Sequence, residues 1–146
     1  MLMDGGQPFT TGNCQYQDDL VAQDPTNSKL FIAVKIDNLD SPVFAMVDTG
    51  APYCVFDSEI LDALGYSFER DNTIEMSTRI GSIRGTIHRI QITLLANEGE
   101  SLDVDSTFFV PEKWRGNIIG YMGCLQRIRF AVDPSKNTFH FGKWSQ

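Results

Sequence analysis

The chain has 146 residues, of which 42% are hydrophobic, so it is long enough for one domain with a hydrophobic core and too short for two ordinary domains. Its formal net charge of -7, without a basic stripe carrying interleaved aromatic residues, excludes nucleic acid as an expected partner. No apolar run approaches the roughly 20 residues that a membrane-spanning helix needs, and residues 1–17 lack the pattern of a signal peptide, so we expect a soluble, cytoplasmic protein with no membrane span.

The cysteine and histidine residues give no support to a metal site or a thiol nucleophile. Cys14, Cys54 and Cys124 are odd in number and far apart, so the sequence predicts free thiols, and neither a disulfide framework nor a metal knuckle. His88 and His140 are the only histidines, and they do not stand in a metal-binding spacing. We therefore expect no metal and no cofactor.

The first part of the chain divides into a polar segment and the beginning of a domain. Residues 1–28 are polar, contain several glycines and show no periodicity, which predicts a loose N-terminal arm or an irregular segment. The domain is expected over residues 29–146. Its first two elements are short, apolar, β-branched runs at 30–36 and 43–47, which predict two strands joined by a turn.

A short helix and a β-hairpin are expected next. Residues 57–58 can cap a helix that Gly65 can terminate. Residues 73–80 and 86–95 are typical of two strands, and residues 81–85 carry a glycine at each end. This pattern predicts a hairpin with its turn at residues 81–85.

The second half of the chain continues with strand patterns. Along the second strand of that hairpin, Ile90, Ile92 and Leu94 would face one side of the sheet. The further expected elements are a strand at 102–110 stopped by Pro111, a short apolar run at 118–119, a brief helix at 121–127, and a closing hairpin of 129–132 and 138–141.

The most informative motif is a strand that delivers an acid, a hydroxyl group and a glycine onto a tight loop. The apolar residues 44–47 are followed directly by Asp48, Thr49 and Gly50. Such a tripeptide can also be an ordinary turn, in which the aspartate bonds its own backbone and the glycine supplies a positive φ. The tripeptide by itself therefore leaves a catalytic loop and a plain turn open.

Two further segments follow this motif in a recognisable order. The three segments are residues 47–51, residues 80–87, and residues 117–120 followed by a predicted helix. Together they resemble the retropepsins, the family of retroviral proteases and their cellular and bacterial relatives, over about residues 29–142. The resemblance implies a mostly β, retropepsin-like closed β-barrel, which is the single-lobe acid protease fold, with two short helices.

The resemblance also implies a role for each residue of the first segment. Asp48 would be the catalytic carboxylate, and the hydroxyl group of Thr49 would lock the loops of two subunits together. Gly50 would let the substrate backbone approach closely, and Ala51 would line the cleft beside it.

The second and third segments would contribute substrate-binding residues. The resemblance identifies the second as a flap that closes over the substrate, with two glycines that allow the tip to bend around an apolar residue. The expected flap residues are Gly81, Ser82, Ile83, Arg84 and Gly85. In the third segment, Ile118 would line the apolar pocket that receives a substrate side chain, although an isoleucine pair before a glycine is also typical of core.

The sequence departs from the retroviral pattern at two positions. Retroviral members commonly carry an aspartate and an arginine that pair with each other where this chain has Pro52 and Tyr121. Both charges are replaced together, so no unpaired charge remains. Residues 120–142 look more like bacterial retropepsin-like proteins than viral ones.

These observations predict an aspartic endopeptidase that acts on polypeptide substrates as a homodimer. Its chemistry needs two carboxylates that share a proton, and the chain has no second Asp-Thr-Gly or Asp-Ser-Gly, so the second Asp48 must come from another copy. The alternative is an inactive module of the same fold that binds a peptide or a partner, which Pro52 and Tyr121 favour. A metal-dependent enzyme is the third possibility, without a ligand motif to support it.

Overall fold

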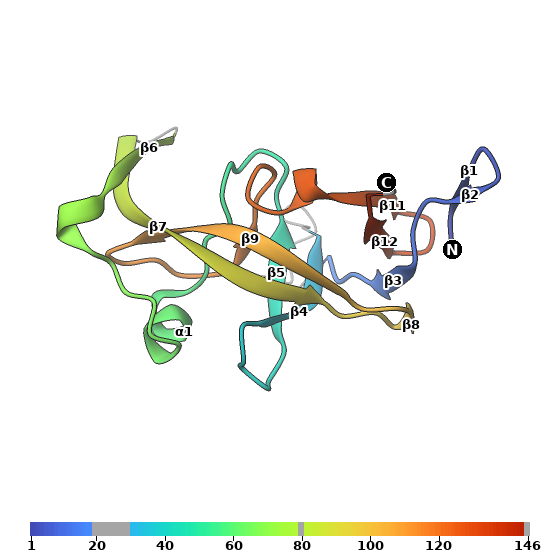
Figure 1. Ribbon diagram of the computed structural model, residues 1–146, viewed down its shortest axis with the longest axis horizontal. Coiled ribbons are helices and arrows are strands. Elements are labelled where there is room, and N and C mark those ends of the chain that lie inside the picture. Colours follow the sequence, from blue (N-terminus) through green and yellow to red (C-terminus); the bar gives the residue numbers. More distant parts are fainter. Residues whose placement is uncertain (19–29, 79–80, 145–146) are drawn as a thin grey trace.

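The computed structural model describes residues 1–18, 30–78 and 81–144, and in these ranges the chain is mostly β-structure (Figure 1). No helix in the described ranges is long and apolar enough to cross a membrane. The strands are β1 (Met3–Asp4), β2 (Gln7–Pro8), β3 (Gly12–Gln15), β4 (Phe31–Ile36), β5 (Val43–Val47), β6 (Ile74–Thr78), β7 (Gly81–Leu94), β8 (Glu98–Gly99), β9 (Leu102–Pro111), β10 (Ile118–Ile119), β11 (Ile128–Asp133) and β12 (Thr138–Lys143). The helices are α1 (Ser58–Ala63) and the 3-10 helices η2 (Arg70–Asn72) and η3 (Leu125–Arg127).

A six-stranded sheet forms the centre of the molecule, with the strand order β10-β5-β4-β7-β6 and β9 paired to β7. The long strands β7 and β9 run antiparallel in register from Gly85 opposite Pro111 to Leu94 opposite Leu102, and they cross most of the molecule side by side (Figure 1). Ile90, Ile92 and Leu94 are buried on one face, as their alternation predicts. β7 also pairs with β4 and β6, so this pair of long strands connects the parts of the central sheet.

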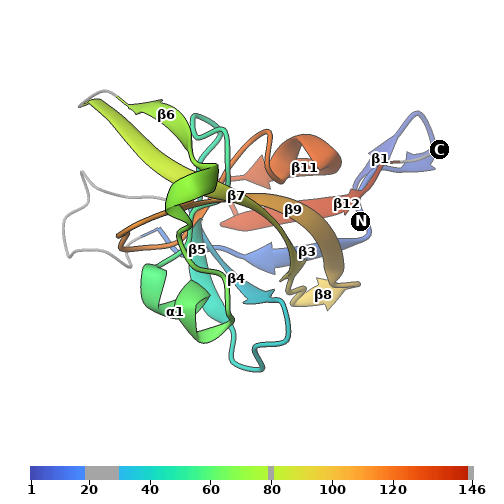
Figure 2. The ribbon, with the colours of Figure 1, turned by 60° about the vertical axis from the view of Figure 1, so that its left-hand side comes forward.

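A smaller sheet has the order β11-β12-β3-β8 and includes a strand that the sequence analysis missed. Residues 12–15 form β3, which lies between β12 and β8 (Figure 2). Cys14 and Tyr16 are buried in the core, and Thr10 is fully buried. The prediction of a loose or irregular arm over residues 1–28 is therefore wrong for this part of the segment, while residues 19–28 lie outside the described residues.

Aromatic side chains fill the core from both sheets. The ring of Phe56 packs edge-on against Phe108 of β9, with ring centroids 5.0 Å apart. In the smaller sheet, Phe139 of β12 stacks on Phe130 of β11 at 5.8 Å. Phe56, Phe108 and Phe139 are fully buried, so the connection after β5 and both sheets depend on a shared apolar core.

The predicted helix at residues 58–64 is confirmed, because α1 spans Ser58–Ala63 and the carboxylate of Asp57 accepts the N–H of Glu59 at 3.0 Å. The predicted helix at residues 121–127 is wrong for its first part, where the chain turns, and only η3 at its end is helical. The N–H groups of Leu125 and Gln126 donate to carbonyl oxygens five residues back, and that of Arg127 donates to Cys124 three residues back, so the regular i→i−4 bonds of an α-helix do not form here.

The closed barrel implied by the resemblance stays a prediction. The central sheet ends at β10 and β6, and the smaller sheet ends at β11 and β8. In Figure 2 the β6–β7 end of the central sheet points to the upper left, and α1 lies at the lower left. The connection after β5 and the β6–β7 hairpin both contribute to one hollow, which is described next.

Candidate active site

Asp48 lies where β5 ends between two neighbouring strands. β5 pairs antiparallel with β4 and parallel with β10, where Ile118 is opposite Met46 and Ile119 is opposite Val47. The N–H of Asp48 donates to the carbonyl oxygen of Ile119 at 3.0 Å. Because Asp48 is the first residue after the strand, this pairing fixes the position of its backbone.

The loop after β5 is closed by bonds to Asp48 itself. The N–H of Gly50 donates to Oδ1 of Asp48 at 2.9 Å, and the N–H of Ala51 donates to its carbonyl oxygen at 3.2 Å. Thr49 and Gly50 are exposed at the tip. An aspartate turn of this kind holds the carboxyl group at the surface, where a ligand or a second chain can reach it.

Asp48 lines a hollow of about 490 Å³ whose walls are mostly apolar. The full lining is Asp48, Gly50, Ala51, Pro52, Tyr53, Val55, Met76, Ser77, Thr78, Trp114 and Ile118. It comes from the loop after β5, from β6, from the connection after β9 and from β10. A carboxyl group beside an apolar hollow of this volume can meet a peptide that places an apolar side chain in it.

The backbone packs closely at Gly120, behind the loop that carries Asp48. A Cβ atom at Gly120 would collide with the carbonyl oxygen of Tyr53 and would lie 2.9 Å from that of Ala51. Beyond this glycine, the N–H of Tyr121 donates to Ala51 at 2.7 Å, and the N–H of Gly123 donates to Pro52 at 2.8 Å. The segment after β10 therefore holds the loop that carries Asp48 from behind.

Comparison with solved structures shows which known folds this chain is similar to. A retropepsin-like aspartic protease from Rickettsia conorii matches with a TM-score of 0.60 and 15% identity, over 90% of this chain and 92% of that chain. The retroviral protease-like domain of Ddi1 from Leishmania major matches with a TM-score of 0.53 and 19% identity, over 80% of this chain and 94% of that chain. No protein-family model matches the chain, and no curated protein matches it in sequence.

The chain has the retropepsin-like aspartic protease fold. This agrees with the resemblance found in the sequence, and the mostly β structure agrees with it too. With identities of 15% and 19%, the likeness is one of fold.

The hairpin that the sequence analysis placed over the active site has a different register from the predicted one. Gly81 and Gly85 belong to β7, where Gly81 is opposite Thr78 and Gly85 is opposite Ile74. The prediction of a turn at residues 81–85 is therefore wrong, and residues 79–80, which connect the two strands, lie outside the described residues. Gly85 suits a strand here because the ring of Phe109 fills the space of a side chain.

The retropepsin fold separates the predicted site residues into two groups. Asp48, Gly50, Ala51 and Ile118 line the hollow, and Thr49 lies in the exposed loop tip beside it. Ser82, Ile83 and Arg84 line a second hollow, and Gly81 and Gly85 line neither.

Sequence reasoning missed several residues of the apolar wall. Tyr53, Val55, Met76 and Trp114 all line the hollow with Asp48. A signal for Trp114 was present, because it is a large aromatic residue in a polar connection just before β10. Its backbone exchanges two hydrogen bonds with Ser58 at the start of α1, at 2.7 and 3.0 Å.

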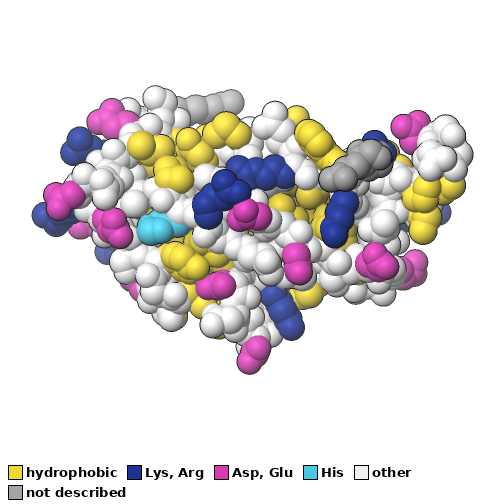
Figure 3. All heavy atoms as spheres, in the orientation of Figure 1, with side chains coloured by type: hydrophobic (Ala, Val, Ile, Leu, Met, Phe, Trp, Pro, Cys, Tyr) yellow, Lys and Arg dark blue, Asp and Glu magenta, His cyan; other side chains and the backbone are white. Residues whose placement is uncertain are grey.

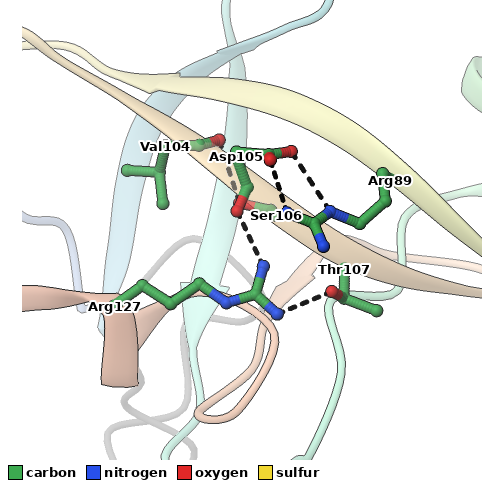
Figure 4. A network of polar contacts seen from close by, with 6 residues as sticks. All are labelled: Arg89, Val104, Asp105, Ser106, Thr107 and Arg127. Atoms are coloured by element: carbon green, nitrogen blue, oxygen red, sulfur yellow. Dashed lines mark hydrogen bonds and ion pairs between the residues drawn. The ribbon is translucent and has the colours of Figure 1, made fainter.

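A polar network anchors the segment behind the active-site loop to β9 (Figure 4). The guanidinium group of Arg127 donates to the carbonyl oxygen of Asp105 and to Oγ1 of Thr107, both at 2.7 Å. Arg89 of β7 donates to the carboxylate of Asp105 at 2.5 Å, and this bond lowers the pKa of Asp105. Because these residues are exposed, their ion pair contributes little to the free energy of folding. The bonds of Arg127 to β9 join η3 to that strand.

Two of the three cysteines meet behind the loop, within the part of the chain that the structure describes. Cys54 and Cys124 are buried, and both are free thiols. Their hydrogen bond lowers the pKa of Cys124 and, with burial, raises that of Cys54 well above its usual range. These thiols are fully buried and do not line the hollow, so nothing in this arrangement makes them nucleophiles for a bound peptide.

No group of three or more potential metal ligands gathers in the described ranges. His88 lies on β7, and His140 lies on β12 in the other sheet. The hollow with Asp48 contains neither of them. Asp48 is the one residue of its lining that carries a carboxyl group.

Proposed function

We propose that the protein is an aspartic endopeptidase whose active site is completed by Asp48 from each of two subunits. The observation that carries the proposal is the position of Asp48 in an exposed loop at the edge of an apolar hollow, in a chain with the retropepsin-like fold. The sequence offers no second motif of this kind, so each chain supplies half of the site.

Peptide hydrolysis follows from two carboxyl groups that share one proton. The ionised Asp48 takes a proton from water, whose oxygen attacks the carbonyl carbon, while the protonated Asp48 donates a hydrogen bond to the carbonyl oxygen. The tetrahedral intermediate then breaks its C–N bond as the leaving amine takes a proton from the pair. The products are a new carboxyl end and a new amino end.

The neighbouring residues support binding in this proposal. Gly50 has no side chain to keep a peptide backbone away, and Ala51 and Ile118 line the hollow beside Asp48. The β6–β7 hairpin would cover the bound peptide, with Ser77 and Thr78 at the wall of the hollow. The exposed Thr49 at the loop tip would meet the same residue of the second subunit.

Dilution tests this proposal, because a site shared between two chains disappears when the dimer dissociates. We expect the specific activity on an apolar peptide substrate to fall on dilution, in parallel with the dimer fraction measured by sedimentation. Titration with a statine inhibitor should give one site per two chains, and a chelator should leave the activity unchanged. A fully active monomer would contradict the proposal.

The same experiment distinguishes the proposed endopeptidase from the alternative, a module that binds peptides without cleaving them. Tyr121 is 42% exposed beside the active-site loop, and Pro52 is exposed next to it, which favours this alternative because neither can form an ion pair between subunits. A monomer that binds peptides and never cleaves them would establish it.

The rate should depend on pH in a bell shape. Two carboxyl groups within hydrogen-bonding distance hold one proton over an intermediate range, and only that state contains both an acid and a base. Below this range both groups are protonated, and above it both are ionised, so activity falls on each side. We expect a maximum on the acidic side of pH 7 in a profile of kcat/KM, and a flat profile would rule out a shared proton.

A further inference from the structure

A second hollow lies beside the active-site hollow and has a different character. Its volume is about 500 Å³, and it is bounded by β7, by η2 and the residues around it, and by the connection after β9. Its lining is Phe68, Arg70, Thr73, Ser82, Ile83, Arg84, Pro111, Glu112 and Lys113. Three basic side chains thus share this hollow with one carboxyl group.

The basic residues of this hollow can change partners. Arg70 lies 3.7 Å from Glu112, Arg84 lies 3.7 Å from Glu75, and all four side chains are largely exposed. Exposed pairs of this kind contribute little to stability, so a carboxylate of a ligand can replace a partner at little cost. Lys113 has no ion pair within the described ranges.

The net charge of this hollow is opposite to that of the chain. Its lining contains Arg70, Arg84 and Lys113 against Glu112, and with Glu75, which pairs with Arg84 from outside the lining, the local charge is +1, whereas the chain as a whole carries -7. Acidic and basic side chains are interspersed on the face shown in Figure 3, including the end that carries β6 and η2. A local positive region on an acidic protein attracts an anionic group to that place and not to the surface in general.

The two hollows share their walls, so one peptide can reach both. Lys113 lines the second hollow, and the next residue, Trp114, lines the hollow with Asp48. In the β6–β7 hairpin, Ser77 lines the active-site hollow and its register partner Ser82 lines the second one. An extended peptide advances about 3.3 Å per residue, so a segment of a few residues can reach from one hollow to the other.

We infer that the second hollow is a substrate subsite for an acidic residue. The preferred substrates are polypeptides in which a glutamate or aspartate lies a few residues from the apolar side chain held beside Asp48. The inference rests on the proposed function and names its substrate class. The carboxylate binds between Lys113 and Arg84, and the hydroxyl group of Ser82 lies on the same wall. Phe68 and Ile83, both half-buried, contact the aliphatic part of the side chain.

A binding experiment tests the subsite without depending on turnover. The protein with Asp48→Asn is titrated into each of two labelled peptides. The peptides share an apolar centre and differ only in having glutamate or glutamine in the flanking segment. Binding is followed by fluorescence anisotropy at low and at high salt. We expect the glutamate peptide to bind roughly tenfold more tightly at low salt, with a smaller difference at high salt. Lys113→Gln and Arg84→Gln should each remove most of this difference.

The matched control is Lys136→Gln, which makes the same change of charge at the exposed β11–β12 turn and should preserve the preference. Equal binding of the two peptides overturns the inference, and so does a preference that Lys136→Gln reduces as much as Lys113→Gln. Cleavage by the unsubstituted protein is measured on the same peptides. If it cleaves both at the same rate, the subsite is wrong and the proposed function stands; if it cleaves neither and the acidic preference in binding persists, the proposed function fails and the subsite stands.

Discussion

Replacing Asp48 by asparagine should abolish peptide cleavage and leave the fold intact. In the proposed dimer the substitution changes both subunits at once, so the general base and the shared proton would be lost together. Removing a central catalytic group from a hydrolase costs roughly 10⁴-fold or more in kcat, and we expect an effect of this size for Asp48→Asn. The measurement is kcat on an apolar peptide, with purified protein free of the unsubstituted chain.

The fold should survive because the amide of asparagine can make the bond that closes the loop. Its side-chain oxygen can accept the N–H of Gly50 as Oδ1 of Asp48 does at 2.9 Å. The matched control is Asp40→Asn, which makes the same chemical change in the exposed turn before β5 and should cleave normally. Substantial cleavage by Asp48→Asn, with an unchanged urea midpoint, would show that the chemistry resides elsewhere.

The sequence predicted the strand that carries Asp48 because local and long-range signals agree there. Residues 43–47 favour a strand by composition, and β4 and β10 pair with them from the two sides. Ile118 was assigned to the same region by resemblance, and its parallel pairing opposite Met46 places it beside Asp48 in the fold. Agreement between composition and pairing is what makes such a segment predictable.

The hairpin register could not be predicted because glycine has two different uses. Gly81, the first residue of β7, has a φ of 137°, which a residue with a side chain rarely adopts. This is the use of glycine that the sequence pattern suggested, a backbone conformation that only glycine adopts easily. Gly85 lies in the middle of β7, where the ring of Phe109 from β9 takes the space of its missing side chain. Only the tertiary contact distinguishes the second use from the first.

The strand β3 escaped prediction for a related reason. The sequence Gly12-Asn13-Cys14-Gln15 has neither β-branched residues nor a long apolar run, and it becomes a strand because β12 and β8 pair with it from both sides. The apolar wall of the candidate site was missed because its residues come from four separate segments that meet only in the fold.

Replacing Gly120 by alanine should destabilise the protein and damage the site together. The new methyl group would meet the backbone of Tyr53 and lie 2.9 Å from the carbonyl oxygen of Ala51, so the chain itself must move. Overpacking against backbone atoms costs about 1–3 kcal/mol or more, and we expect a loss of this size in the free energy of unfolding measured in urea. Both displaced residues line the hollow with Asp48, so kcat/KM should fall further than stability alone explains.

A second glycine distinguishes this steric effect from a general loss of backbone freedom. Gly65 follows α1 with a φ of 88°, and no other atom lies within 4 Å of the place that a Cβ atom would occupy, so Gly65→Asn introduces a larger side chain into open space. Asparagine tolerates this left-handed conformation better than other residues with a side chain, so the cost should stay below the roughly 1–2 kcal/mol that such residues meet there. Equal losses of stability in Gly120→Ala and Gly65→Asn would show that close packing behind the active-site loop does not hold Asp48 in place.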